Sequence, residues 1–167
     1  MRWFLIGCAL TVLVGVVAAC GGSSSGSDAQ RATQQKADYW DIDKIEKDFH
    51  EATTRKDIDL MMGLWAPNAT LTAGPEMTAA GRTEIQQFWL EESVAFEPTN
   101  HWISDHPAYK VEITVNGDRG TLHFECHYVD ADTERMVLVT AADLDVARID
   151  GGWLITNMVA GSTELTV

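Results

Sequence analysis

Residues 45–71, IEKDFHEATTRKDIDLMMGLWAPNATL, contain a clear helical pattern. Apolar side chains in this stretch and just before it recur at intervals of three and four positions: Ile42, Ile45, Phe49 and Ala52. This spacing places them on one face of a helix, and Asp41 is available to cap its start. The stretch therefore predicts a helix that buries one side against the rest of the domain.

A second helix is predicted directly after the first. Asp57 can cap it and Pro67 ends it, and its apolar side chains are Leu60, Met61, Leu64 and Trp65. A short strand over 69–73 follows. A third helix then opens at Gly81, with Ile85, Phe88 and Trp89 on one side.

The rest of the chain reads as strands, over roughly 101–105, 109–115, 119–128, 135–149 and 153–160. Helices followed by an antiparallel meander predict an α+β fold with the helices on one face of the sheet.

The Asn116–Gly117 turn predicts the register of the strands on either side of it. A two-residue loop would pair 115 with 118 and 113 with 120. One face, toward the helices, would then carry Tyr109, Val111, Ile113, Leu122, Phe124, Cys126 and Tyr128. The outward face would carry Lys110, Glu112, Thr114, Thr121, His123, Glu125 and His127.

Residues 45–71, the run GRTEIQQFW at 81–89 and the strand pair ending ARIDGGWLI at 147–155 resemble the nuclear transport factor 2-like superfamily. Within it the sequence is most similar to SnoaL-like polyketide cyclases and ketosteroid isomerases, over about 40–167. The resemblance implies a cone-shaped, curved antiparallel sheet wrapped around the N-terminal helices, with an apolar pocket at one end. The fold hosts isomerases, cyclases, dehydratases and binding modules, so it does not decide among them.

The resemblance also implies positions for catalytic groups. The isomerase's general base falls on Ala73 and its tyrosine oxyanion donor on Phe49, and neither residue can do that chemistry. Its third group, a protonated carboxylic acid, falls on Asp145. Without a base, proton abstraction beside a carbonyl is not expected.

Two residues remain as candidate acid–base groups. Asp145, between Leu144 and Val146, is expected to enter an apolar pocket, with pairing to Arg148 as the structural alternative. His101 is the second, because a histidine near this point often lines the pocket in SnoaL-like proteins. The pocket itself is expected to be lined by Trp65, Trp89, Trp102 and Tyr128, although such aromatics are equally suited to a core.

His123, Glu125 and His127 alternate along one strand, a spacing that can hold a metal ion. On an outward face beside Lys110, charge pairing or a dimer interface is the favoured interpretation, and neither a metal nor a cofactor is expected. His50 and His106 read as surface residues. Cys126 reads as a small apolar core residue with no base nearby.

The N-terminus predicts export and lipid attachment. Arg2 precedes an apolar run that ends in Val17-Ala18-Ala19-Cys20, which resembles the lipobox of bacterial lipoproteins. We expect a signal peptide over 1–19, diacylglycerol and fatty acid such as palmitate on Cys20, a flexible Gly/Ser linker over 20–37 and a folded domain over 38–167. The protein would then sit on the outer leaflet or outer membrane, facing away from the cytoplasm, and an uncleaved membrane anchor is the alternative.

The charge argues against two classes of partner. Without residues 1–19 the chain has 11 basic and 25 acidic residues, a net charge of −14. Such a surface repels nucleic acid and anionic lipid headgroups. Three functions stay open: a binding module for an apolar small molecule or an envelope partner, a SnoaL-like enzyme using Asp145, and a structural subunit of an envelope complex. A homodimer is a further possibility, because strand 136–146 is apolar on both sides.

Overall fold

The computed structural model describes residues 24–104 and 109–165. It contains three α-helices, one 3₁₀-helix and seven strands, with these bounds: α1 Ser24–Arg55, α2 Ile58–Gly63, β1 Trp65–Ala73, β2 Met77–Ala80, α3 Gly81–Glu91, η1 Val94–Phe96, β3 Trp102–Ser104, β4 Tyr109–Asn116, β5 Arg119–Asp130, β6 Arg135–Ile149 and β7 Gly152–Glu164. The predicted α+β class is confirmed.

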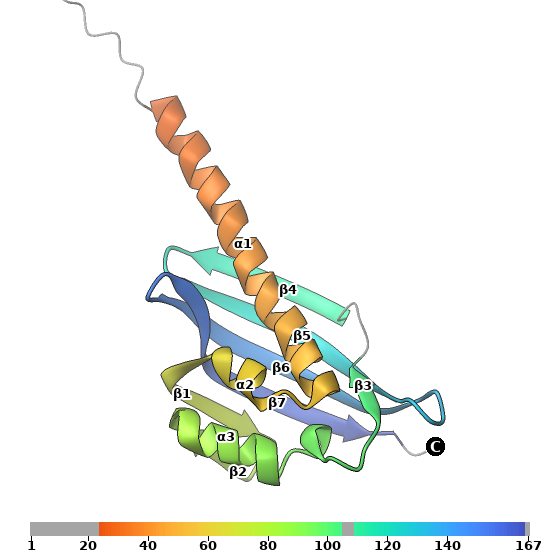
Figure 1. The fold of residues 1–167 in the computed structure, drawn as a ribbon. Helices are drawn as coiled ribbons and strands as arrows, with labels where there is room; N and C mark the ends of the chain where they lie inside the picture. Colours follow the sequence, from red (N-terminus) through yellow and green to blue (C-terminus); the bar gives the residue numbers. More distant parts are fainter. Residues whose placement is uncertain (1–23, 105–108, 166–167) are drawn as a thin grey trace, which may run out of the picture.

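One curved sheet forms a single layer, and the helices cover its inner face (Figure 1). The strand order is β2-β1-β7-β6-β5-β3, and β4 pairs with the same strand as β3, which is β5. The pairs β4–β5, β5–β6 and β6–β7 are antiparallel, as the meander predicts, whereas β1 and β7 run parallel. That parallel pair brings the end of β1 beside the end of β7.

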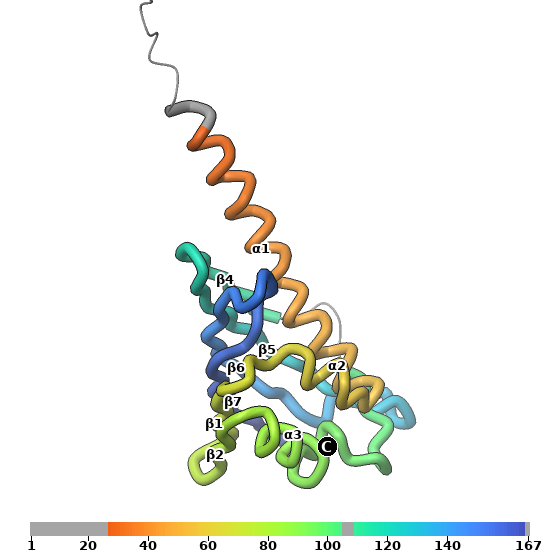
Figure 2. Tube along the Cα trace, turned by 60° about the vertical axis from the view of Figure 1, so that its left-hand side comes forward, coloured from red at the N-terminus to blue at the C-terminus, as the bar shows by residue number. Residues whose placement is uncertain are grey.

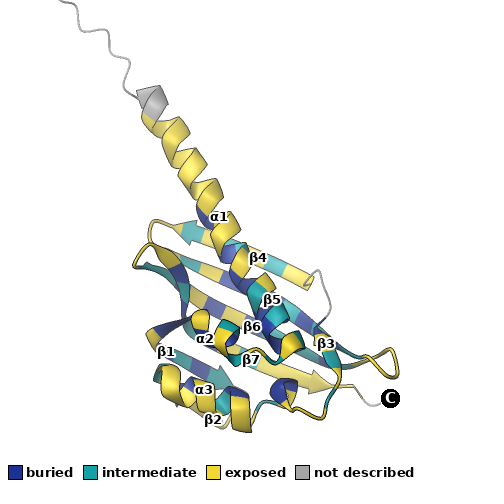
Figure 3. Cartoon of the chain, viewed as in Figure 1, coloured by how far each residue is buried: buried dark blue, intermediate teal, exposed yellow. Residues whose placement is uncertain are grey.

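Helix α1 is far longer than predicted. It begins at Ser24 and runs for 32 residues, so Asp41 lies inside the helix and cannot be its N-cap. The segment 24–37, expected to be a flexible linker, is helical and projects from the body of the domain (Figure 2). Its described side chains are exposed, and burial begins at Asp38 (Figure 3). None of the helices in residues 24–104 and 109–165 is long and apolar enough to cross a membrane.

The second helix is shorter than predicted. Asp57 caps it as expected, because its Oδ1 accepts a hydrogen bond from the Leu60 amide at 2.9 Å. The helix ends at Gly63, and Trp65 begins β1 instead of continuing the helix to Pro67. β1 is therefore nine residues long, and the following strand β2 was not predicted.

The β4–β5 register differs from the predicted one by two positions. Asn116 pairs with Arg119 and Ile113 with Leu122, so the two-residue loop is Gly117-Asp118. A shift of two preserves the faces of a strand, and Leu122 is buried as predicted. Tyr109 is the exception, because the register shifts again between it and Glu112. Its ring lies on the outward face, stacked on His127 with ring centroids 4.1 Å apart.

A partly buried ion pair anchors α1 to the sheet where the helix enters the body. The Asp38 carboxylate accepts a hydrogen bond from Arg148 of β6, whose guanidinium also lies 4.8 Å from the centre of the Trp153 ring. Burial alone would raise the pKa of Asp38, but hydrogen bonds from Arg148 and Gln34 lower it below its usual value. This contact fixes the direction in which the exposed part of α1 leaves the domain.

Candidate functional site

A cavity of about 280 Å³ lies between α1, α3 and the inner face of the sheet. Its lining combines residues from α1, β1, α3, the 92–95 segment and β5 to β7: Phe49, Leu71, Ala73, Gly74, Phe88, Trp89, Glu92, Ser93, Val94, Ala95, Tyr128, Leu138, Thr140, Met158, Ala160 and Ser162. The parallel pairing of β1 with β7 closes one wall, where Ala73 lies opposite Ala160.

The inner end of the cavity is apolar, whereas its mouth combines polar and apolar side chains. The buried part is formed by Phe49, Leu71, Trp89, Ala95, Tyr128, Leu138 and Met158. The phenol of Tyr128 stays protonated at neutral pH, because burial raises its pKa well above the ordinary value. Exposed residues at the mouth include Glu92, Val94 and Ser162. Such a site suits a small apolar molecule with one polar end.

A lysine holds the cavity wall at the end of α1. Lys56 has a positive φ of 55° and donates a hydrogen bond from Nζ to the Ala95 carbonyl at 2.6 Å. Burial lowers the pKa of this lysine. The contact ties η1, which carries Ala95 and Phe96 into the core, to α1.

Two of the positions implied by the isomerase resemblance meet in this cavity. Phe49 and Ala73 both line it, although they come from α1 and β1. The two positions that the resemblance assigns to catalytic groups therefore do lie in the cavity, although this chain has no catalytic side chain at either of them.

Asp145 is not in the cavity, contrary to the sequence-based expectation. Leu144 and Val146 are buried on the inner face of β6, so strand alternation directs Asp145 outward, where it is exposed. Its carboxylate accepts a hydrogen bond from the Asn157 amide at 3.3 Å and lies in an outer groove with His123 and Asp143. Its suggested alternative partner, Arg148, instead pairs with Asp38 and Asp118.

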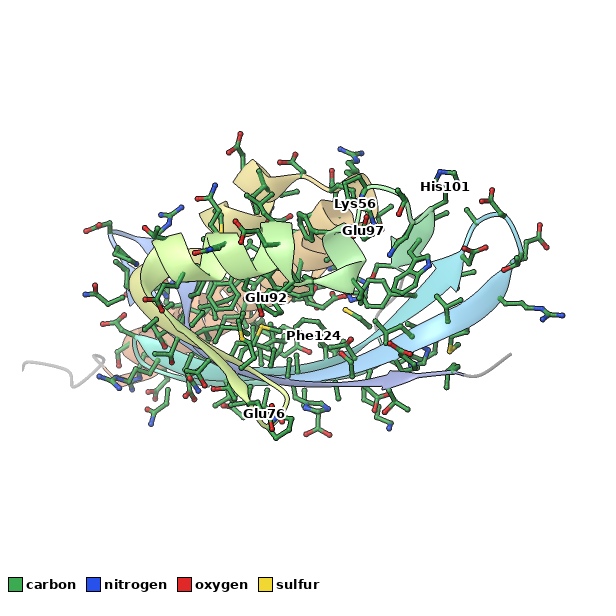
Figure 4. The ribbon with its side chains drawn as sticks, turned by 90° about the horizontal axis from the view of Figure 1, so that it is seen from below. Lys56, Glu76, Glu92, Glu97, His101 and Phe124 are labelled. Carbon is green, nitrogen blue, oxygen red and sulfur yellow. The ribbon has the colours of Figure 1, made fainter. Side chains whose placement is uncertain are left out.

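The other predicted site residues divide between the cavity and the rest of the domain. Trp89 and Tyr128 line the cavity, whereas Trp65 is a fully buried core residue and Trp102 packs near Tyr128 without reaching the cavity. His101 lies at the edge of the molecule (Figure 4), with its side chain 64% exposed and its Nδ1 2.9 Å from Asp132. It therefore lies outside the cavity that it was expected to line.

A buried polar cluster beneath the sheet was missed from the sequence. His50, expected on the surface, is 0% exposed. Its Nδ1 lies 2.9 Å from Ser104 Oγ, and its Nε2 lies 3.0 Å from Cys126 Sγ and 3.3 Å from Glu46 Oε1. The helical spacing contains a signal for this cluster. Positions 46, 50 and 53 directly follow the apolar positions 45, 49 and 52 and widen the buried face of the helix. Their side chains are polar, and polar side chains on a helix are ordinarily predicted to be exposed.

Cys126 therefore has a base beside it, contrary to expectation, yet it remains a thiol. Burial raises its pKa to about 12, so the thiolate is not formed at neutral pH. Neither Cys126 nor His50 lines the cavity. The arrangement is a hydrogen-bonded core contact between α1, β3 and β5.

His123, Glu125 and His127 lie on the outer face, as predicted, and are engaged in charge pairing. Lys110 Nζ lies 2.6 Å from Glu125 Oε1, and this hydrogen bond lowers the pKa of Glu125. His123 Nδ1 lies 2.7 Å from Asp143 Oδ1. Within residues 24–104 and 109–165, no three histidine, cysteine or acidic side chains are grouped so as to hold a metal ion.

Comparison with solved structures shows the same fold in several bacterial proteins. An NTF2-like protein with a cystatin-like fold from Novosphingobium aromaticivorans gives a TM-score of 0.68 at 15% identity, over 84% of this chain and 90% of its own. A hexachlorocyclohexane dehydrochlorinase from Novosphingobium barchaimii gives 0.66 at 13% identity, over 81% and 94%. A protein of unknown function from Nostoc punctiforme gives 0.66 at 16% identity, over 76% and 92%. At these identities the likeness shows the fold alone.

The sequence matches no curated protein. It does match the SnoaL-like domain family over residues 34–159, which is most of the chain and includes all of the cavity-lining residues except Ala160 and Ser162. The chain belongs to the SnoaL-like domain family.

Proposed function

We propose that this chain is a lipid-anchored SnoaL-like protein that binds a small apolar molecule outside the cytoplasm without converting it. The observation that carries the proposal is the composition of the cavity. Its inner end is built from aromatic and aliphatic side chains, and the two isomerase positions within it are Phe49 and Ala73. A wall of this kind favours holding a ligand over acid–base catalysis, which needs a titratable group within reach of the reacting atoms.

The titratable groups of the described cavity lining are few. They are the buried Tyr128 phenol and the Glu92 carboxylate at the mouth. Asp145 and His101, the two groups on which an enzyme was expected to depend, both lie elsewhere. This distribution supports a binding module ahead of a SnoaL-like cyclase.

Filling the cavity is expected to weaken the binding of a bicyclic apolar probe such as naphthalenemethanol. Ala160→Leu adds three carbons to the cavity wall, and they take up space that the probe would otherwise fill. Burial of each methylene of the probe contributes about 0.8 kcal/mol, so the lost burial should weaken binding at least tenfold. Calorimetric titration of the full chain in phosphatidylcholine nanodiscs, with empty nanodiscs subtracted, measures the change.

Two variants serve as controls. Ala141→Leu makes the same change on the outward face, because its neighbour Ala142 is buried inside. Asp145→Asn should also keep the affinity for the probe within tenfold of that of the unchanged chain. Equal losses in Ala160→Leu and Ala141→Leu would count against the cavity as the binding site.

The lipid anchor is proposed from the Val17-Ala18-Ala19-Cys20 sequence, which lies outside the described residues. Cys20→Ser is expected to abolish incorporation of an alkyne-tagged palmitate in a bacterial host and to release the protein from the membrane fraction. Cys8→Ser, which changes a cysteine inside the expected signal peptide, should keep the label. Label retained in Cys20→Ser would refute the anchor.

A further inference from the structure

The mouth of the cavity has charge of one sign only. Glu92 is the one charged residue in the cavity lining that the structure describes, and it is exposed beside the opening. Figure 4, which views the molecule from below, shows it near the middle of the view, between α3 and the sheet. A ligand whose apolar part fills the inner end therefore presents its polar end to a carboxylate.

The cavity continues into a wider acidic groove. This groove, of about 670 Å³, shares Ala73, Phe88 and Glu92 with the cavity. It adds the carboxylates of Glu76, on the turn before β2, and Glu84, whose Oε2 accepts a hydrogen bond from the Ala80 amide at 2.8 Å. Neither lining contains a lysine or arginine among the described residues, and no ion pair with a described cation involves Glu76, Glu84 or Glu92.

The size of the cavity limits the apolar part of the ligand. Its volume of about 280 Å³ is close to twice that of an engineered cavity of about 150 Å³ that holds benzene. One ring or two fused rings fit this space, whereas a four-ring skeleton does not fit inside it.

From the apolar cavity and its carboxylate mouth together, we propose that the ligand is an apolar amine: one or two rings enter the cavity, and the ammonium group faces Glu92. This inference rests on the proposed binding function and names the ligand class for the same site. An anionic ligand of the same shape would place its carboxylate against Glu92 and the acidic groove, which costs free energy through like-charge repulsion.

Three probes of one shape test the proposal: naphthylmethylamine, naphthalenemethanol and naphthoate, titrated into the full chain in phosphatidylcholine nanodiscs with empty nanodiscs subtracted. The amine is expected to bind about two- to fivefold more tightly than the alcohol, as for an exposed ion pair, and naphthoate most weakly. Glu92→Gln should remove the preference for the amine, so that the amine and the alcohol bind about equally well to this variant.

Glu91→Gln is the matched control. It changes the net charge by the same amount on the neighbouring residue, which does not line the cavity and whose Oε2 accepts a hydrogen bond from Gln87. It should keep the preference for the amine. Equal effects of the two variants would attribute the preference to the overall negative field and overturn the proposal.

The failures of the two proposals are distinguishable. If the amine and the alcohol bind equally well to the unchanged chain, the apolar-amine proposal is wrong while the cavity still binds. If none of the three probes binds, the proposed binding function is wrong as well.

Discussion

Replacing Phe49 with alanine is expected to lower the free energy of unfolding by about 3–5 kcal/mol, the usual cost of deleting a buried aromatic ring. Phe49 is 1% exposed, and its ring makes edge contacts with Trp89 and Phe124 at centroid distances of 5.5 and 5.4 Å. The space left by the ring would merge with the existing cavity, because Phe49 already lines that cavity. Neighbouring side chains would not fill it. Urea unfolding followed by circular dichroism measures the change.

Phe88→Ala is the control for this variant. Phe88 also lines the cavity but is only half-buried on α3, so it should cost clearly less stability. The Phe49→Ala variant should also accept larger ring systems than the unchanged chain. A loss below about 1 kcal/mol for Phe49→Ala would mean that the cavity wall collapses around the missing ring.

Gly120→Ala is expected to lower the free energy of unfolding by about 1–3 kcal/mol through overpacking. A Cβ at this position would lie 2.6 Å from the Thr114 carbonyl oxygen, 3.0 Å from Ile42 Cδ1 and 3.2 Å from Val146 Cγ2. The first of these neighbours is backbone, so β4 and β5 must move apart locally. Differential scanning calorimetry should show a lower Tm.

Gly161→Ala provides the comparison. Gly161 also lies in a strand, β7, but a Cβ there would meet nothing within 4 Å. Its stability should change by less than about 0.5 kcal/mol, as for other surface substitutions. If both variants lose the same stability, the loss comes from replacing a strand glycine in general and not from the close contact between residue 120 and β4.

The fold could be predicted because its main pattern is local. The stripe of Ile42, Ile45, Phe49 and Ala52 is buried as the spacing requires, and the strands fall close to their predicted ranges. The flexible-linker prediction is wrong over 24–37, because the Gly/Ser composition is confined to residues 21–27. Residues 27–37, SDAQRATQQKA, are rich in alanine, glutamine, lysine and arginine, which favour helix.

The candidate site could be predicted only in part. The resemblance placed Phe49 and Ala73 at one site. It placed Asp145 wrongly, and strand alternation predicts the correct side, because Leu144 and Val146 face the core and Asp145 between them must face outward. The cavity itself depends on how α3 packs against β1, β6 and β7. Such contacts join residues far apart in the sequence, and no periodicity within one element contains them.

The helical residues 24–37 hold Ser24, where the described part of the chain begins, at a set distance and direction from the body of the domain. At about 1.5 Å per residue they form a strut of roughly 20 Å, and the partly buried Asp38–Arg148 pair clamps its base. Because each residue turns a helix by about 100°, one residue inserted into 28–37 would turn Ser24 to another side of the helix axis. Cys20, the proposed lipid site, lies four positions before Ser24, so in a lipid-anchored chain this strut would stand between the bilayer and the body of the domain.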